Sequence, residues 1–140
     1  MPIIDTSVYV ATLNRSEVNH QVCVQWMKKV KNDGVQLYAP NIILAEVAAA
    51  ISRGQNDLEA AKSAIKHLES IILMELVPVS PELAADAAQI AAEQRIRGCD
   101  AVFVALAKQR DDILITLDRQ QMERSQDIIQ VSEPFVEADS

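Results

Sequence analysis

The chain has 140 residues, 49% hydrophobic and 24% charged, which is typical of one globular domain and excludes collagen, disordered chains and disulfide scaffolds. Its formal net charge of -7 does not attract nucleic acid, so a phosphate-bearing substrate would need a bound metal or a local basic patch. A signal-peptide pattern, a Cys-x-x-Cys pair and an apolar run near the ~20 residues of a membrane span are all missing, so we expect a reduced protein of the cytoplasm with no membrane contact.

Short apolar runs alternate with segments in which apolar residues recur at spacings of three and four. In chain order, these patterns predict a strand at 2–4 with a helix directly after it, a helix at 17–31, a strand at 35–39, helices at 42–53 and 57–72, a strand at 76–79, helices at 81–97 and 101–107, a strand at 113–117, helical turns at 119–125 and a strand at 128–131. We expect Val18, Leu58 and Ile72 on the apolar faces of their helices, and Asn41 as a helix cap.

The order of these elements predicts the fold class. Strands alternate with helices and no β-hairpin signal joins them, so we expect an α/β fold: a single three-layer α/β/α domain with a central parallel sheet of four to five strands. Pro78 favours an edge position for the strand at 76–79. The domain is expected to span residues 1–135, and residues 136–140 to form an acidic C-terminal tail.

Two carboxylates follow buried strands directly. Asp5 ends the first strand and Asp118 follows the strand at 113–117. If both strands run parallel in one sheet, these carboxylates emerge at the same edge, which is where ligands bind in open α/β sheets. As an isolated residue, Asp5 is better explained as a helix cap.

Two further acids occupy unusual or ambiguous places. Glu46 has apolar neighbours three and four positions away on its helix, and a carboxylate on an apolar face is normally protonated, paired or bound to a metal. Pairing with Arg53, seven residues on, is the alternative. Asp100 stands at the start of the most apolar helix and could be a simple cap; because two helices separate the third and fourth strands, topology does not tell which edge of the sheet it reaches.

Four carboxylates close together would repel by several kcal/mol per pair at an effective dielectric near 20, and a divalent cation would relieve this repulsion. Oxygen ligands without His or Cys favour Mg²⁺ or Mn²⁺ over Zn²⁺. His20 and His67 lie on polar helix faces, so we expect both at the surface. A site of this kind suits phosphodiester hydrolysis by metal-activated water.

Four segments together resemble the ordered motifs of PIN-domain nucleases. They are Ile3-Ile4-Asp5-Thr6-Ser7-Val8, Leu44-Ala45-Glu46-Val47, the run from Cys99-Asp100-Ala101 to Ala107, and Ile115-Thr116-Leu117-Asp118. Within that superfamily, the length is similar to that of VapC-type toxins of toxin-antitoxin pairs.

The resemblance implies a Mg²⁺- or Mn²⁺-dependent endoribonuclease, its acids gathered at one edge of the sheet. It also implies the roles of individual residues: Asp5, Glu46, Asp100 and Asp118 as catalytic metal ligands, with Ser7 and Thr116 as supporting hydroxyls. The implied partners are an RNA substrate, a cognate antitoxin and a second copy of the chain in a homodimer.

One departure from the family pattern leaves a second metal open. Many relatives carry a further acid soon after the fourth motif, where Arg119, Gln120 and Gln121 stand in this chain. We expect Arg53 and Arg119, which lie near Glu46 and Asp118, to contact RNA phosphates.

Two rival functions are compatible with the same features. The missing acid and the negative charge keep open a catalytically weak PIN-like module that binds RNA or protein. A phosphatase or phosphotransfer receiver is less favoured, because Ser7 stands where phosphoaspartyl hydrolases have a second Asp and a late-strand Lys is missing.

Overall fold

The computed structural model describes residues 1–135, so the predicted tail at 136–140 lies outside the described residues. The described chain contains one sheet of five parallel strands in the order β3-β2-β1-β4-β5. The strands are β1 Ile3–Ile4, β2 Leu37–Pro40, β3 Met74–Val77, β4 Leu114–Ile115 and β5 Val131–Ser132. The predicted α/β fold with a parallel sheet is therefore confirmed.

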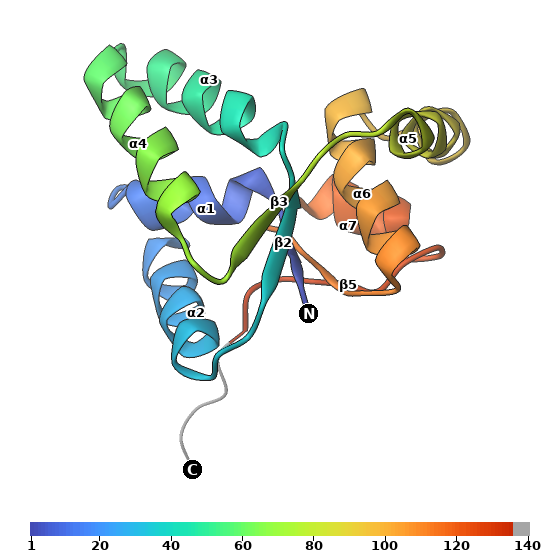
Figure 1. Ribbon diagram of the computed structural model, residues 1–140, viewed down its shortest axis with the longest axis horizontal. Coiled ribbons are helices and arrows are strands. Elements are labelled where there is room, and N and C mark those ends of the chain that lie inside the picture. Colours follow the sequence, from blue (N-terminus) through green and yellow to red (C-terminus); the bar gives the residue numbers. More distant parts are fainter. Residues whose placement is uncertain (136–140) are drawn as a thin grey trace.

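Helices cover both faces of this sheet. They are α1 Thr6–Leu13, α2 His20–Asn32, α3 Ile43–Gln55, α4 Leu58–Ser70, α5 Pro81–Gln94, α6 Gly98–Arg110 and α7 Arg119–Ser125. Figure 1 shows α1 to α4 on one side of the sheet and α5 to α7 on the other, which confirms the three layers. Within the described residues, none of these helices has both the length and the apolar character needed to cross a membrane.

The centre of the sheet is the centre of the core. Ile3 and Ile4 of β1 are fully buried because β1 lies between β2 and β4 with helices on both faces. The helix α6 contacts β1, β2 and β4, and its Phe103 is completely buried. Burying a side chain of this size stabilises the fold by about 1.5–3 kcal/mol. The apolar run from Ala101 to Ala107 in α6 fits this central position.

Three residues expected on apolar helix faces are exposed instead. Val18 is 91% exposed because α2 begins only at His20. Leu58 is 63% exposed because it is the first residue of α4, after the cap Asp57. Ile72 is 94% exposed because the backbone leaves the helix at Ile71. The predicted helices were thus too long at the ends where caps stop them.

Several boundaries also differ from the prediction around the second and third strands. The strand predicted at 35–39 lies at Leu37–Pro40, and Pro40 is paired with Val77 of β3. Asn41 does not cap α3; the cap position is Ile42, which makes no side-chain capping bond. The strand β3 starts two residues earlier than expected, and it lies at the edge of the sheet, as Pro78 indicated.

The helices and the last strand in the second half of the chain have other boundaries than predicted, and one of these differences changes the place of Asp100. The helix predicted at 81–97 is shorter: α5 ends at Gln94, because Arg95 takes a left-handed conformation, and the helix predicted at 101–107 already begins at Gly98 as α6. Asp100 is therefore inside the first turn of α6 rather than before it. The last strand lies at Val131–Ser132 instead of 128–131.

Candidate active site at the carboxyl edge of the sheet

Each of the four predicted acids lies at the N-terminal end of a different helix. Asp5 and Asp118 are the N-caps of α1 and α7, and each accepts a hydrogen bond from a backbone N–H of its helix. Glu46 and Asp100 lie in the first turns of α3 and α6. The partial positive charge at a helix N-terminus favours a carboxylate, so four helices help to offset the repulsion among these groups.

The four acids line one pocket of about 350 Å³ at the carboxyl edge of the strands. Asp5 follows β1 and Asp118 follows β4, and these two strands are hydrogen-bonded neighbours. The chain passes to β2 on one side of β1 and to β4 on the other, which is the arrangement that creates a ligand crevice in open α/β sheets. The other residues lining the pocket are Thr6, Ser7, Ala45, Ala49, Ala50, Arg53 and Arg97.

Asp5 is the most enclosed of the four, with only 4% of its surface exposed. Its Oδ2 accepts hydrogen bonds from Ser7 Oγ at 2.6 Å, from Thr116 Oγ1 at 3.0 Å and from the Ser7 backbone N–H at 3.2 Å. Burial raises the pKa of Asp5; these hydrogen bonds act in the opposite direction, and the charge of Asp100 adds to the increase. The structure thus places both predicted supporting hydroxyls against one oxygen of Asp5.

Glu46 is half-buried and lines the same pocket as Asp5. Thr6 Oγ1 donates a hydrogen bond to Glu46 Oε1 at 2.8 Å. Burial raises the pKa of Glu46, the Thr6 hydrogen bond lowers it, and the charges of Asp5 and Asp100 raise it further. The sequence reasoning did not select Thr6, although its place directly after Asp5 could have indicated it.

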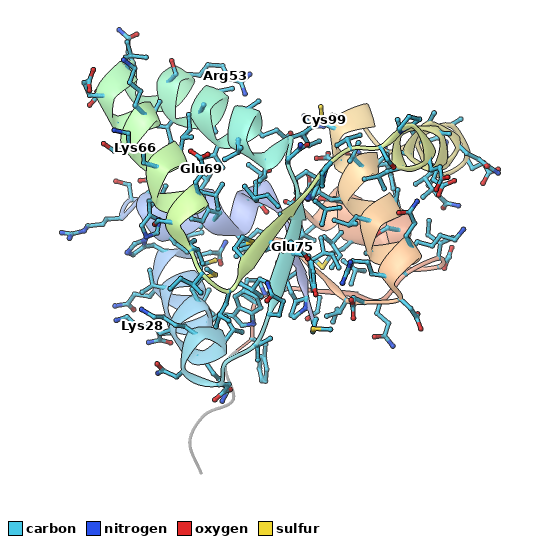
Figure 2. All side chains as sticks on the ribbon, in the orientation of Figure 1. Lys28, Arg53, Lys66, Glu69, Glu75 and Cys99 are labelled. Atoms are coloured by element: carbon cyan, nitrogen blue, oxygen red, sulfur yellow. The ribbon has the colours of Figure 1, made fainter. Side chains whose placement is uncertain are left out.

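The alternative partner for Glu46 was Arg53. In the part of the chain that the structure describes, Arg53 forms no ion pair with Glu46, and its Nε donates to the carbonyl oxygen of Ala49 at 3.3 Å. Arg53 does line the acidic pocket, and Figure 2 shows it on α3 at the same end of the molecule as Cys99 at the start of α6.

Asp100 is paired with Arg97, which the sequence analysis did not select. Arg97 Nε lies 3.2 Å from Asp100 Oδ2 and donates a hydrogen bond to it. The side chain of Asp100 is 14% exposed, whereas that of Arg97 is 81% exposed. The spacing of three residues at the start of a helix was the available signal, because such residues are neighbours on a helix surface.

Gln121 occupies the region where the family pattern suggested a further acid. Its side chain is buried; Oε1 lies 3.2 Å from Thr116 Oγ1, and Nε2 donates to the Asp100 carbonyl oxygen at 3.4 Å. Its backbone N–H also donates to Asp118. Gln121 therefore links the end of β4 to the first turns of α6 and α7.

Arg119 does not line the four-acid pocket. It lines a separate hollow with Met122, Gln126 and Glu133. Although Arg119 adjoins Asp118 in sequence, the structure places only Arg53 of the two predicted phosphate contacts in the acidic pocket. Adjacent residues at a helix start point in directions about 100° apart, which explains the separation.

The donor chemistry of the pocket fits a hard divalent cation, because its acids offer only oxygen and the charge of Asp100 helps to raise the pKa values of Asp5 and Glu46. The side chains are not already arranged as a metal cage: within residues 1–135, no group of three or more His, Cys, Asp or Glu could hold an ion as it stands. Arg97 takes up Oδ2 of Asp100 instead, whereas Thr6 bonds only Oε1 of Glu46. The residues fit by type and location, and the contact of Arg97 with Asp100 would exchange on binding.

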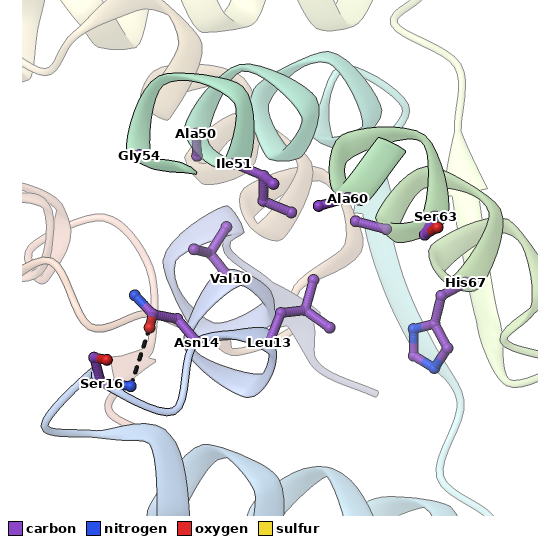
Figure 3. Close-up of a pocket in the computed structure, with 11 residues that line it drawn as sticks. Val10, Leu13, Asn14, Ser16, Ala50, Ile51, Gly54, Ala60, Ser63 and His67 are labelled. Atoms are coloured by element: carbon purple, nitrogen blue, oxygen red, sulfur yellow. Dashed lines mark hydrogen bonds between the residues drawn. The ribbon is translucent and has the colours of Figure 1, made fainter. Parts of the chain in front are cut away.

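A larger hollow of about 650 Å³ lies between α1, α3 and α4. Figure 3 shows Val10 and Leu13 on α1 facing Ile51 on α3 and Ala60 on α4, with His67 at one side. Among the residues that line it there is no carboxylate, so it lacks the chemistry of the acidic pocket. His67 is exposed and His20 half-buried, and neither lines the pocket of the four acids.

Comparisons with known proteins agree with this fold. The model of the PIN domain matches residues 3–126. Among curated proteins, no sequence matches the chain.

Three solved structures illustrate the similarity in fold. The crystal structure of FitAcB from Neisseria gonorrhoeae is 22% identical, with a TM-score of 0.73 over 96% of this chain and 98% of that one. VapC20 of Mycobacterium tuberculosis, described as a sarcin-ricin loop cleaving toxin, is 17% identical, with a TM-score of 0.74 over 88% of this chain and 94% of that one. A toxin-antitoxin complex from Klebsiella pneumoniae is 16% identical, with a TM-score of 0.68 over 96% of this chain and 98% of that one.

Proposed function

Because this chain belongs to the PIN-domain family, we propose that it is a VapC-like toxin: a metal-dependent endoribonuclease that hydrolyses RNA phosphodiester bonds. The observation that supports the proposal is the convergence of Asp5, Glu46, Asp100 and Asp118 on one pocket at the carboxyl edge of the sheet. Repulsion among four carboxylates in one pocket would destabilise the fold unless a cation compensates it. A stable α/β domain does not require such a cluster, so cation binding is the better explanation for it.

Asp5, Glu46, Asp100 and Asp118 are the residues that would hold Mg²⁺ or Mn²⁺. Ser7 and Thr116 hold Asp5 through Oδ2, and Asp5 lines the pocket, so Oδ1 is the oxygen that would bind the metal. A bound divalent ion would supply a water of lowered pKa and neutralise charge that develops on the phosphate.

Arg53 lines the same pocket and carries a guanidinium suited to a neighbouring RNA phosphate. It provides the local positive charge that the acidic chain as a whole lacks. We propose that Arg119 contacts a phosphate farther from the acidic pocket than Arg53 does, since Arg119 lines a different hollow.

The proposed partners are a cognate antitoxin and a second copy of the chain. One of the structures similar in fold is described as a toxin-antitoxin complex, which supports the first of these. The proposed nuclease domain spans residues 1–135. The proposed location is the cytoplasm, where the free thiols of Cys23 and Cys99 would stay reduced.

Cleavage of single-stranded RNA in Mn²⁺ by the parent and by Asp118→Asn tests the function. Asparagine caps a helix as well as aspartate does, so α7 should stay folded while a charged ligand is lost. We expect cleavage to fall at least about a hundredfold, as for other deletions of transition-state charge stabilisation. Asp127→Asn, an exposed acid outside the pocket, is the matched control and should cut like the parent.

The second candidate is a catalytically weak PIN-like module that binds RNA or protein. It is favoured by the lack of a ready three-ligand group within the described residues. Saturable RNA binding by the parent without cleavage, across a wide range of Mg²⁺ and Mn²⁺, would select it over the nuclease.

A further inference from the structure

Of the ion pairs that the described residues form, one involves an acid of the pocket, and this is the pair between Arg97 and Asp100. Arg97 itself lines the pocket together with Asp5, Glu46 and Asp118. The guanidinium of Arg97 therefore already places one positive charge beside the four carboxylates and offsets part of their repulsion.

The geometry of this ion pair makes it easy to exchange. Only Nε of Arg97 donates to Asp100, at 3.2 Å, rather than two nitrogens of the guanidinium fork. The Arg97 side chain is 81% exposed, so solvent screens its charge and weakens the pair, although the Asp100 side chain is only 14% exposed. Long exposed side chains change rotamer on the nanosecond timescale, so the pair can open without a change of fold.

The charge of Arg97 acts on more than Asp100. The hydrogen bond from Arg97 to Asp100 raises the pKa of Arg97, and the charges of Asp100, Asp118 and Glu46 add to this effect. In turn, the charge of Arg97 lowers the pKa of Glu46. Arg97 also lines the pocket together with all four acids, so its charge lies close to each of them.

A divalent ion entering the pocket would compete with Arg97 for the same carboxylate oxygen of Asp100. Once displaced, the guanidinium would stand at the mouth of the pocket with its donors directed to solvent. A phosphate offers it two oxygens in the spacing that the fork matches, which is a stronger pair than the single bond to Asp100.

We propose that Arg97 is an internal counter-ion of the acidic pocket that exchanges Asp100 for an RNA phosphate when a divalent ion binds. Arg97 would then both restrain metal binding in the free protein and position the substrate. The inference rests on the proposed function for the identity of the substrate, but its metal-binding half does not require cleavage.

Arg97→Ala is the variant that separates this role from a structural one. The backbone carbonyl of Arg97 accepts the bond from Ala101 at the start of α6, and this contact survives removal of the side chain. Arg97→Lys keeps the charge without the fork. Arg15→Ala, at an exposed position outside the pocket, controls for the loss of one positive charge.

Two affinities are measured for the parent and each variant. Calorimetric titration of the metal-free proteins with Mn²⁺ gives the first. Anisotropy of a labelled single-stranded RNA at several salt concentrations gives the second, with Ca²⁺, which also takes carboxylate oxygens, in place of Mn²⁺ to limit cutting.

The two affinities should change in opposite directions in Arg97→Ala. Mn²⁺ should bind up to about fivefold tighter, since an exposed competing ion pair is gone. RNA should bind roughly tenfold more weakly, as expected for a lost charge-assisted contact. The slope of log affinity against log salt should fall by about 0.7, the value for one phosphate contact on a single strand. Arg97→Lys should retain the slope, and Arg15→Ala should bind Mn²⁺ like the parent.

A purely structural Arg97 would weaken both affinities together, and that result would overturn the inference. Unchanged Mn²⁺ affinity, or an RNA slope equal to that of Arg15→Ala, would also overturn it. If the parent cleaves RNA and Arg97→Ala behaves like the parent in both assays, the nuclease stands and this inference falls. If the parent does not cleave RNA but the opposite changes are seen, the inference stands and the nuclease falls.

Discussion

Thr6 Oγ1 donates a hydrogen bond to Glu46 Oε1 at 2.8 Å, across 40 residues of sequence. This bond joins the first residue of α1 to the first turn of α3 and fixes one acid of the pocket relative to Asp5. It also stabilises the charged form of Glu46, because it lowers a pKa that burial raises. Thr6 is therefore a positioning residue of the proposed site.

Thr6→Val should weaken Mn²⁺ binding near neutral pH. The replacement keeps the side-chain shape but removes the donor, so the pKa of Glu46 should rise further and protons should compete better with the metal. Mn²⁺ titrations between pH 5 and pH 8 check this, with the deficit largest at low pH. Thr6→Ser, which keeps the hydroxyl, should behave like the parent; an equal loss in both variants would mean that packing rather than the hydrogen bond matters.

Ser7→Ala should destabilise the fold by about 1–3 kcal/mol, the cost of leaving buried polar partners unpaired. Ser7 Oγ donates to Asp5 at 2.6 Å and accepts from the backbone N–H of Leu117 at 3.0 Å, so it links the ends of β1 and β4. Urea unfolding measures the difference. Ser16→Ala, at an exposed serine of the loop after α1, is the control and should change stability by less than about 0.5 kcal/mol.

Asp5→Asn should stabilise the metal-free protein at neutral pH. The raised pKa of Asp5 means that the folded state holds its proton more tightly than the unfolded chain does. The stability that the protonated Asp5 contributes is therefore fully present below the pKa of about 3.9 that this carboxyl has in the unfolded chain. It is lost as the pH rises through the higher pKa that Asp5 has in the folded protein. Asparagine can accept the same hydrogen bonds without a charge, so its melting temperature should exceed that of the parent at pH 7 and approach it near pH 3.5.

Thermal unfolding of the parent and Asp5→Asn over this pH range, with chelator present, measures the effect. Asp127→Asn, whose side chain is exposed, should follow the parent at every pH. A parent as stable as Asp5→Asn at pH 7 would mean that neighbouring dipoles fully compensate the buried charge.

Mn²⁺ should offset the destabilisation that the buried charge of Asp5 causes in the metal-free parent at neutral pH. A ligand at a hundred times its dissociation constant adds about 2.7 kcal/mol to the stability of the state that binds it. The melting temperature should therefore rise with Mn²⁺ in the parent and in Asp127→Asn, and rise less in Asp118→Asn. Equal shifts in all three proteins would place the binding outside the acidic pocket.

Arg53→Ala and Arg119→Ala should differ in their effect on RNA binding. Arg53 lines the pocket of the four acids, whereas Arg119 lines another hollow. Each variant removes one positive charge, so the overall field changes equally. We expect the RNA affinity, measured by anisotropy, to fall several-fold more in Arg53→Ala. The reverse order would show that RNA leaves the pocket across α7 rather than across α3.

The sequence by itself determined the order and type of the elements and the four acids. Apolar spacing depends only on neighbours three and four residues away in a helix or two in a strand, so α4 and the buried strand β1 could be recognised locally. The same holds for Asp5 and Asp118, since each directly follows an apolar strand and caps the next helix. Helix ends were less predictable, as Val18 and Ile72 illustrate, because a single cap decides them.

Only the tertiary structure decided which side chain each acid contacts. Thr116 reaches Asp5 from 111 residues away because β1 and β4 are neighbours in the sheet, and no local pattern encodes that strand order. The course of α5 and α6 likewise sets the edge at which Asp100 lies, beside Arg97. Contacts between distant segments depend on how all layers pack at once, and this is why Arg97 entered the pocket while Arg119, next to an acid in sequence, did not.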